Sequence, residues 1–109
     1  MKTSITSHIL DLQKGKPASG VKVTLTSPTN EIFTAKTNDD GRVVTWDKEV
    51  NLCTGNWQAH FDIGAWFESN KSDSFYHEVV IAFIVKHTDE HYHIPLLLNS
   101  HGYSTYRGS

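Results

Sequence analysis

Cysteine, long apolar runs and blocks of charge are scarce in this sequence, and each shortage excludes a class of protein. Cys53 is the one cysteine among 109 residues, so no disulfide can form within the chain and the fold has to rest on packing. We expect Cys53 to be a small buried apolar residue. No apolar run approaches the ~20 residues of a membrane-spanning helix, and the first residues lack the apolar segment of a secretory signal. We therefore expect a cytoplasmic protein without membrane contact, although a processed periplasmic form would have the same composition.

Charge is balanced along the sequence, which argues against nucleic acid as a partner. Ten lysine and arginine residues stand against twelve aspartate and glutamate residues, for a net charge of −2, and neither sign forms a block. A glycine-rich phosphate loop and a Gly-x-Ser-x-Gly nucleophile motif are also missing, so covalent catalysis is disfavoured. At this length, residues 1–109 are expected to form one domain with one core.

Apolar and polar residues alternate in several short segments, which is the pattern of half-buried β-strands. In the clearest case, Val21, Val23 and Leu25 share one face and polar residues lie between them. Clusters of Gly, Pro, Asn, Asp and Ser separate the segments and predict tight turns. The predicted strands cover residues 3–12, 21–26, 31–36, 42–45, 56–63, 78–86, 91–98 and 103–106. This arrangement favours an all-β fold, an antiparallel β-sandwich.

Two segments depart from simple alternation. Residues 78–86 are almost continuously apolar, which predicts a strand buried on both faces. Residues 64–70 contain Ala65, Trp66 and Phe67 and predict one short helical segment. A sandwich of two sheets leaves open strand edges, and pairing of edges between subunits is one way to cover them. Homo-oligomerisation is therefore expected.

The closing strand, residues 91–98, carries two histidines two positions apart. Side chains alternate across a strand, so His91 and His93 are predicted to share one face while Tyr92 and the apolar residues of the other face point to the core. If Tyr103 of the following strand points inward, Tyr106 lies on the His93 face. Four other histidines are expected to be ordinary surface residues, namely His60, His77, His87 and His101.

A His-x-His pair in a strand can also display a metal ion, because neutral imidazole is the commonest metal ligand. Zinc would need a third and usually a fourth ligand, and in this sequence only His8, on another strand, would add one. We therefore predict no metal site.

Four motifs make the whole chain resemble a known family, the 5-hydroxyisourate hydrolases or transthyretin-related proteins. They are Ser7-His8-Ile9-Leu10-Asp11, Gly15-Lys16-Pro17-Ala18, Thr37-Asn38-Asp39-Asp40-Gly41-Arg42 and His91-Tyr92-His93-Ile94-Pro95-Leu96-Leu97-Leu98 with Gly102-Tyr103-Ser104-Thr105-Tyr106-Arg107-Gly108-Ser109. The terminal Tyr-Arg-Gly-Ser is highly specific. In transthyretin, a hormone carrier of the same fold, the residues at the positions of His8, Arg42 and His93 differ in kind.

The resemblance implies a transthyretin-like sandwich of two four-stranded sheets with one short helix, and a homotetramer whose dimer–dimer interface forms a channel holding the active sites. It implies that His8, Arg42 and His93 are catalytic and that the terminal Tyr106-Arg107-Gly108-Ser109 lines the pocket with them. Of these terminal residues, Tyr106, Arg107 and Ser109 are expected to help to bind the substrate. The implied reaction is hydrolysis of 5-hydroxyisourate to 2-oxo-4-hydroxy-4-carboxy-5-ureidoimidazoline, the step after urate oxidation. No cofactor is implied.

The sequence departs from the family pattern in two places. The family usually has Ser-Pro and an aromatic residue where this chain has Asn99-Ser100-His101, and a proline where it has His77. Both departures concern loop shape. Two alternatives to an enzyme are a transthyretin-like carrier that binds a small aromatic ligand without chemistry, and a structural or adhesive sandwich module.

A mechanism that suits these residues needs an activated water and stabilisation of the charge that develops on a carbonyl. A neutral histidine, either His93 or His8, can take the proton of the water near neutral pH. Arg42 can bind carbonyl oxygens through two hydrogen bonds and stabilise the charge. The carboxylate of Ser109 is expected to orient a neighbouring imidazole and to raise its basicity.

Overall fold

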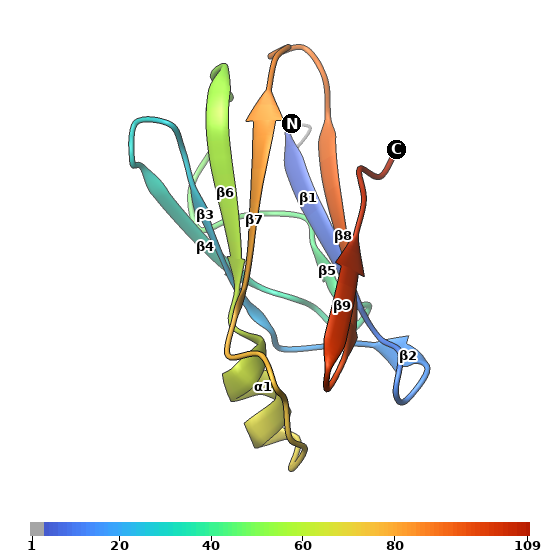
Figure 1. The fold of residues 1–109 in the computed structure, drawn as a ribbon. Helices are drawn as coiled ribbons and strands as arrows, with labels where there is room; N and C mark the ends of the chain where they lie inside the picture. Colours follow the sequence, from blue (N-terminus) through green and yellow to red (C-terminus); the bar gives the residue numbers. More distant parts are fainter. Residues whose placement is uncertain (1–3) are drawn as a thin grey trace.

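The computed structural model describes residues 4–109 and contains two β-sheets that face one another, with one short helix at the end of the sandwich (Figure 1). The first sheet has the strand order β2-β1-β8-β9 with β5 also beside β1, and the second has the order β4-β3-β6-β7. The elements are β1 Ile5–Asp11, β2 Lys16–Pro17, β3 Lys22–Thr26, β4 Ile32–Lys36, β5 Arg42–Val43, β6 Gly55–Phe61, α1 Ile63–Ser69, β7 Val79–Val85, β8 Tyr92–Asn99 and β9 Gly102–Thr105. The predicted transthyretin-like β-sandwich is confirmed.

One pairing in the first sheet is parallel, whereas the other strand pairings of this sheet are antiparallel. Strand β1 runs parallel to β8, with Ile5 opposite Tyr92 and Asp11 opposite Leu98. The two strands lie far apart in the sequence, so no tight turn forces them to be antiparallel. Thr3, where the first predicted strand begins, lies outside the described residues.

The alternating residues of both sheets form the core, as their spacing predicts. Side chains of β3 and β6 from the predicted inward faces are fully or almost fully buried, including Val23, Leu25, Trp57 and Phe61. The rings of Trp57 and Phe33 stack with their centroids 6.2 Å apart, which adds a favourable aromatic contact to the area buried. Cys53 is partly rather than fully buried and packs against this core.

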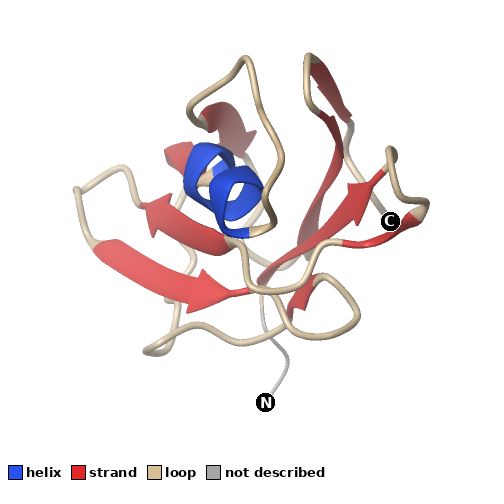
Figure 2. Cartoon of the chain, turned by 90° about the horizontal axis from the view of Figure 1, so that it is seen from below, coloured by secondary structure: helices blue, strands red, loops and turns tan. Residues whose placement is uncertain are grey.

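Helix α1 closes one end of the sandwich (Figure 2), and it matches the helical segment predicted for residues 64–70 to within one residue. Its apolar side chains Ile63, Trp66 and Phe67 are buried. The indole Nε1 of Trp66 donates a hydrogen bond of 2.7 Å to the carbonyl of Ser19, which fixes the helix to the turn before β3. Between residues 4 and 109, no helix is long and apolar enough to cross a membrane.

Strand β7 differs from its prediction, because only its inner face is covered. It is the edge strand of the second sheet, and Val80 and Ile84 on its outer face are 42% and 57% exposed. The continuous apolar run is therefore not the sign of a strand buried on both faces within this chain. It leaves apolar side chains on an open edge.

Strand β5 is shorter than predicted and ends at Val43 instead of Thr45. A longer β5 would bring its backbone beside the carbonyl of Ile5 on β1. The indole of Trp46 takes this place and donates its Nε1 hydrogen bond to Ile5 O over 2.9 Å. A side chain thus satisfies the carbonyl that would otherwise have continued the ladder.

Candidate active site

Strands β1, β5 and β8 bring the three predicted catalytic residues to one face of the first sheet. In the register of these strands, His8 lies opposite Arg42, and His93 lies opposite Thr6. Directly opposed residues project to the same side of a sheet. Because Ile5, Ser7 and Ile9 are buried, Thr6 and His8 project outward, and Arg42 and His93 project with them.

The turn before β5 fixes the position of Arg42. Asn38 Oδ1 accepts hydrogen bonds from the backbone N–H groups of Asp40 and Arg42, at 2.9 Å and 3.0 Å. Gly41 has a φ of 72°, which L side chains rarely adopt, and a Cβ at this position would overlap the carbonyl oxygen of Ile9. Only glycine lets the turn lie this close to β1, so the turn holds Arg42 beside His8.

The imidazole of His93 is half-buried and is surrounded by positive or polar groups. Its Nδ1 lies 2.7 Å from the hydroxyl of Thr6. Burial lowers the pKa of His93 below its ordinary value of 6.5, and the positive charge of Arg42, with His8 and His91, lowers this pKa further. Desolvation and nearby positive charge both disfavour the imidazolium. His93 is therefore neutral near pH 7 and able to accept a proton.

His8 is held differently from His93. Its Nε2 lies 2.9 Å from the carbonyl oxygen of Asp40, and a carbonyl can only accept, so this nitrogen carries the proton. His93 makes its hydrogen bond through Nδ1, which leaves Nε2 as the nitrogen that can act on a bound molecule. Of the two histidines predicted as possible bases, the geometry favours His93.

The segment after β9 brings Gly108 and Tyr106 to His93. Gly108 donates its N–H to the carbonyl of His93 at 2.9 Å, and a Cβ at Gly108 would overlap Cδ2 of the imidazole. Tyr106, 60% exposed, lines with His93 a hollow of about 280 Å³ between the two sheet edges. Ser109 follows Gly108 and is exposed.

Arg107 lines the same hollow as His93 and Tyr106, but its guanidinium packs on Tyr92. Its guanidinium lies 4.7 Å from the centroid of the Tyr92 ring and 3.4 Å from the carboxylate of Glu90. Tyr92 and His93 are neighbours in β8 and point to opposite faces. Both ends of the Arg107–Glu90 pair are substantially exposed, and such pairs stabilise a protein little, so the ion pair by itself holds Arg107 only weakly.

Thr6 was not predicted as a site residue, whereas Gly108 belongs to the terminal segment that the family resemblance placed in the pocket. Thr6 joins the site because β1 and β8 pair in parallel with Thr6 opposite His93, and a strand register between distant segments cannot be read from local patterns. A sequence signal for Thr6 did exist. It lies two positions before His8 and so shares its face.

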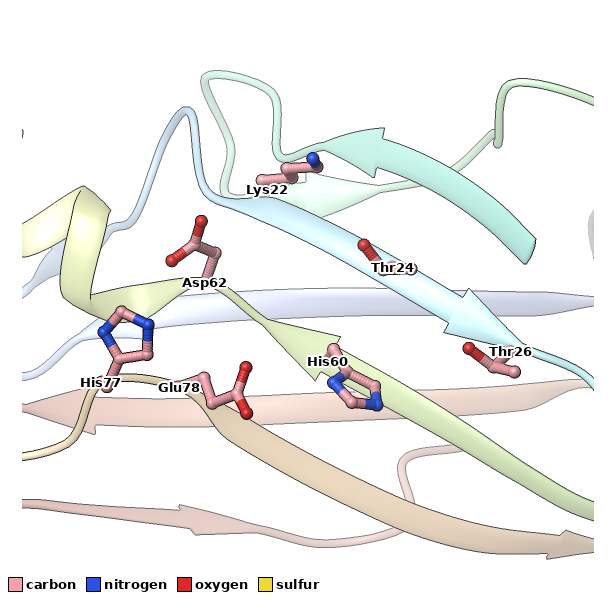
Figure 3. Close-up of a pocket in the computed structure, with 7 residues that line it drawn as sticks. All are labelled: Lys22, Thr24, Thr26, His60, Asp62, His77 and Glu78. Atoms are coloured by element: carbon pink, nitrogen blue, oxygen red, sulfur yellow. The ribbon is translucent and has the colours of Figure 1, made fainter. Parts of the chain in front are cut away.

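A second polar hollow, of about 270 Å³, lies on the outer face of the other sheet (Figure 3). The side chains that line it are Lys22, Thr24, Thr26, His60, Asp62, His77 and Glu78. His60 pairs its Nε2 with Gln58 Oε1 at 3.2 Å. Within residues 4–109, no group of three or more His, Cys, Asp or Glu residues is arranged to hold a metal ion. His60 is partly buried, as His93 is, but no arginine lines this hollow, so it is the weaker candidate.

The chain is similar to known proteins in both sequence and fold. The 5-hydroxyisourate hydrolase of Salmonella dublin is 44% identical over 106 residues, which cover 94% of this chain and 78% of that protein. The structure of Klebsiella pneumoniae 5-hydroxyisourate hydrolase superposes with a TM-score of 0.86 at 34% identity and covers 98% of this chain and 94% of that one. Transthyretin from Sparus aurata, at 24% identity over 98% of this chain and 97% of that one, has a TM-score of 0.85 and shares the fold. The sequence model of the HIUase/Transthyretin family matches residues 5–108, and the chain belongs to this family.

Proposed function

We propose that this protein hydrolyses 5-hydroxyisourate to 2-oxo-4-hydroxy-4-carboxy-5-ureidoimidazoline. The observation that carries the proposal is the half-buried imidazole of His93, whose pKa is lowered by burial and by the positive charge of Arg42. Relatives named 5-hydroxyisourate hydrolase cover most of this chain at 34–44% identity. A carrier without chemistry has no need for a neutral base near an arginine, so the carrier alternative is disfavoured.

His93 is the general base of the proposed reaction. Its Nε2 takes a proton from a water molecule while the water oxygen bonds to a ring carbonyl carbon. The C–N bond of this ring amide then breaks, and the proton held by His93 passes to the leaving nitrogen. The new carboxylic acid releases the second proton of the water to solvent, so a carboxylate and a ureido group remain. General base catalysis of this type contributes on the order of 10² to 10⁴ in rate.

Arg42 stabilises the negative charge that develops on the carbonyl oxygen. Its guanidinium is planar and permanently charged, and it can donate two parallel hydrogen bonds to oxygens of the substrate. His8 lies opposite Arg42 and donates a hydrogen bond from Nε2 to the carbonyl oxygen of Asp40. Its Nδ1 is then the nitrogen that can accept a hydrogen bond from an N–H group of the substrate. Tyr106 and Ser109 close the site on the His93 side, and Arg107 joins them after it leaves Glu90.

The active form is a homotetramer in this proposal, with active sites at the dimer–dimer interface. The catalytic residues lie on an open sheet face, and a single face cannot bury the 70–90% or so of a ligand that typical sites enclose. A second subunit's face would enclose the substrate. The apolar outer face of β7 and the exposed edge of β9 give the subunits surfaces on which to pair.

The test is an ultraviolet assay with fresh urate and urate oxidase, which generate 5-hydroxyisourate in the cuvette. Added protein should speed its decay far beyond the spontaneous rate. His93→Asn should lose about a hundredfold or more of this activity, because it removes the proton acceptor. If His93→Asn speeds the decay of 5-hydroxyisourate as much as the unaltered protein does, the proposed role of His93 is contradicted. If the unaltered protein does not speed this decay, the proposed function is contradicted.

His60→Asn is the matched control. It makes the same substitution in the second hollow (Figure 3), on a strand of the other sheet. Activity should be unchanged, and a loss as large as that of His93→Asn would move the active site to the second sheet.

A further inference from the structure

The hydroxyl of Thr6 lies between two imidazoles. Its Oγ1 is 2.7 Å from Nδ1 of His93 and 2.9 Å from Nε2 of His91. Both distances are hydrogen bonds by ordinary criteria. Thr6 stands in β1, opposite His93 in the neighbouring strand, and its branched Cβ restricts rotation of the side chain. The hydroxyl is therefore held in place by the sheet.

The Thr6 hydroxyl and the imidazoles of His91 and His93 have few protons to share in their two hydrogen bonds. A hydroxyl has one proton to donate and can accept further hydrogen bonds. Thr6 can thus donate to at most one of the two imidazoles and accepts from any imidazole to which it does not donate. When the hydroxyl donates to one neutral histidine, only the facing nitrogen of the other carries a proton. In that arrangement the tautomer of His93 is tied to the tautomer of His91.

Only one of the two arrangements makes His93 a base. If Thr6 donates to His91, Nδ1 of His93 carries the proton and Nε2 has a free electron pair for a water proton. If Thr6 donates to His93 instead, the proton of His93 lies on Nε2, and that nitrogen can only donate. The direction of the Thr6 hydroxyl therefore decides whether His93 can act.

We infer that Thr6 is a positioning residue, which donates to His91, accepts from His93 and so holds His93 in the tautomer with Nε2 unprotonated. This inference rests on the proposed function, because it assigns the hydroxyl a role in the action of His93 as base. As the base takes up a proton, the Nδ1–H···Oγ1 bond becomes charge-assisted and stronger. Thr6 thus favours the transition state without touching the substrate, and His91 is the acceptor that orients it.

Thr6→Val and Thr6→Ser test this role. Valine keeps the shape and the branch and removes the hydroxyl, so kcat should fall about tenfold or more, part of the usual contribution of a general base. KM should stay nearly unchanged, because Thr6 binds the imidazoles and not the substrate. Serine restores the hydroxyl with less restriction at χ1 and should keep kcat within about threefold.

Thr24→Val is the matched control for a threonine in a central strand. Thr24 projects from β3 into the second hollow (Figure 3), and its substitution should leave kcat unchanged. An equal loss in Thr24→Val and Thr6→Val would point to a general effect on the fold and would overturn the inference.

The second measurement needs no substrate. Nitrogen-15 NMR of the imidazoles in the free protein distinguishes Nδ1–H from Nε2–H, and the unaltered protein should have His93 protonated on Nδ1. Thr6→Val should move His93 toward Nε2–H. His91→Phe, which removes the acceptor for the hydroxyl and lets Thr6 donate to His93, should move it further in the same direction.

Failure of the inference and failure of the function have different signatures. If the protein does not hydrolyse 5-hydroxyisourate but His93 changes tautomer in Thr6→Val and His91→Phe, the function is wrong and the control of the tautomer stands. If the protein is active but His93 carries its proton on Nε2, or if Thr6→Val changes neither kcat nor tautomer, Thr6 has no such role. Should Thr6→Val not fold, the tautomer of the unaltered protein and of His91→Phe still decides.

Discussion

His93 is kept neutral by three surroundings at once: partial burial, the guanidinium of Arg42 and two further imidazoles. Each of these disfavours a second positive charge. A base must be unprotonated to act, so its pKa sets the acidic limit of activity. Because the pKa of His93 lies below its ordinary value, the base form persists to lower pH than for a free histidine.

The pH profile of kcat/KM should therefore fall on the acidic side only below pH 6.5, the ordinary value for histidine. Arg42→Gln removes the positive charge that lowers the pKa of His93, so this limb should move to higher pH. Arg42→Lys keeps the charge and should leave the limb where it is. Both variants lose the bidentate contact and should lose activity, by about 3 kcal/mol of transition-state stabilisation in Arg42→Gln. An identical limb in Arg42→Gln and the unaltered protein would contradict the electrostatic cause.

Gly108 supports the imidazole of His93 from the other side. Its φ is not in the left-handed region, so glycine is needed here for space rather than for backbone conformation. Gly108→Ala would press a methyl group against Cδ2 of His93 and turn the ring away. Displacement of a catalytic group by about 1 Å can cost a hundredfold, and kcat should fall by this order.

Gly102→Ala is the control for Gly108→Ala. A Cβ at Gly102 meets only Asn99 Oδ1, at 3.7 Å, which is an ordinary contact. This variant should keep its activity. Equal activity in the two alanine variants would remove Gly108 from the positioning of His93.

At the scale of elements, strand β7 has an apolar outer face on an unpaired edge, and soluble proteins usually protect such edges with charge or proline. Ile84→Lys places a charge on this face and should weaken the association of subunits. Light scattering after size-exclusion chromatography should detect smaller particles, while circular dichroism should keep its β-sheet signal. A particle mass equal to that of the unaltered protein would exclude β7 from the proposed interface.

The opposite edge of the same sheet provides the control. Ile32 in β4 is 56% exposed, nearly the same as the 57% of Ile84, and β4 is the other edge strand. Ile32→Lys should leave the oligomeric mass unchanged. A lower particle mass in this variant alone would assign the proposed interface to β4.

Local patterns predicted most elements but could not predict how distant elements meet. The alternation of Val21, Val23 and Leu25 reports directly on a buried face, because the period of a strand is two. The same logic failed for β7, since an apolar outer face has the same pattern whether this chain or a partner covers it. The register that sets Thr6 opposite His93 depends on packing across the whole sandwich. The family resemblance supplied His8, Arg42, His93 and the terminal segment, whereas the role of Thr6 and the close contact of Gly108 with His93 follow only from the three-dimensional structure.

At the scale of the whole molecule, the site draws on β1, β5, β8 and the segment after β9, so it depends on one shared core. Leu96→Ala should test this dependence, because Leu96 is fully buried and lies between Ile9 of β1 and Thr105 of β9. The free energy of unfolding should fall by about 2–5 kcal/mol. In urea, the change in tryptophan fluorescence and the loss of activity should occur at the same urea concentration in Leu96→Ala, and this concentration should be lower than for the unaltered protein.

Leu12→Ala makes the same change at a site that is 53% exposed and should shift the urea midpoint little. Both variants need to be compared at one protein concentration, because subunit association adds to apparent stability. Loss of activity in Leu96→Ala at a urea concentration well below the fluorescence change would mean that the site opens separately from the core.

The parallel pairing of β1 with β8 also has a consequence in time. The hydroxyl of Thr6 and the imidazole that it contacts are 87 positions apart in the chain, and closing so long a loop costs entropy before any contact repays it. During synthesis, one edge of β1 has no partner until the ribosome has released β8. The amides and apolar side chains on that edge are then open to pairing with other nascent chains. Catalytic competence is thus among the last properties that a growing chain acquires.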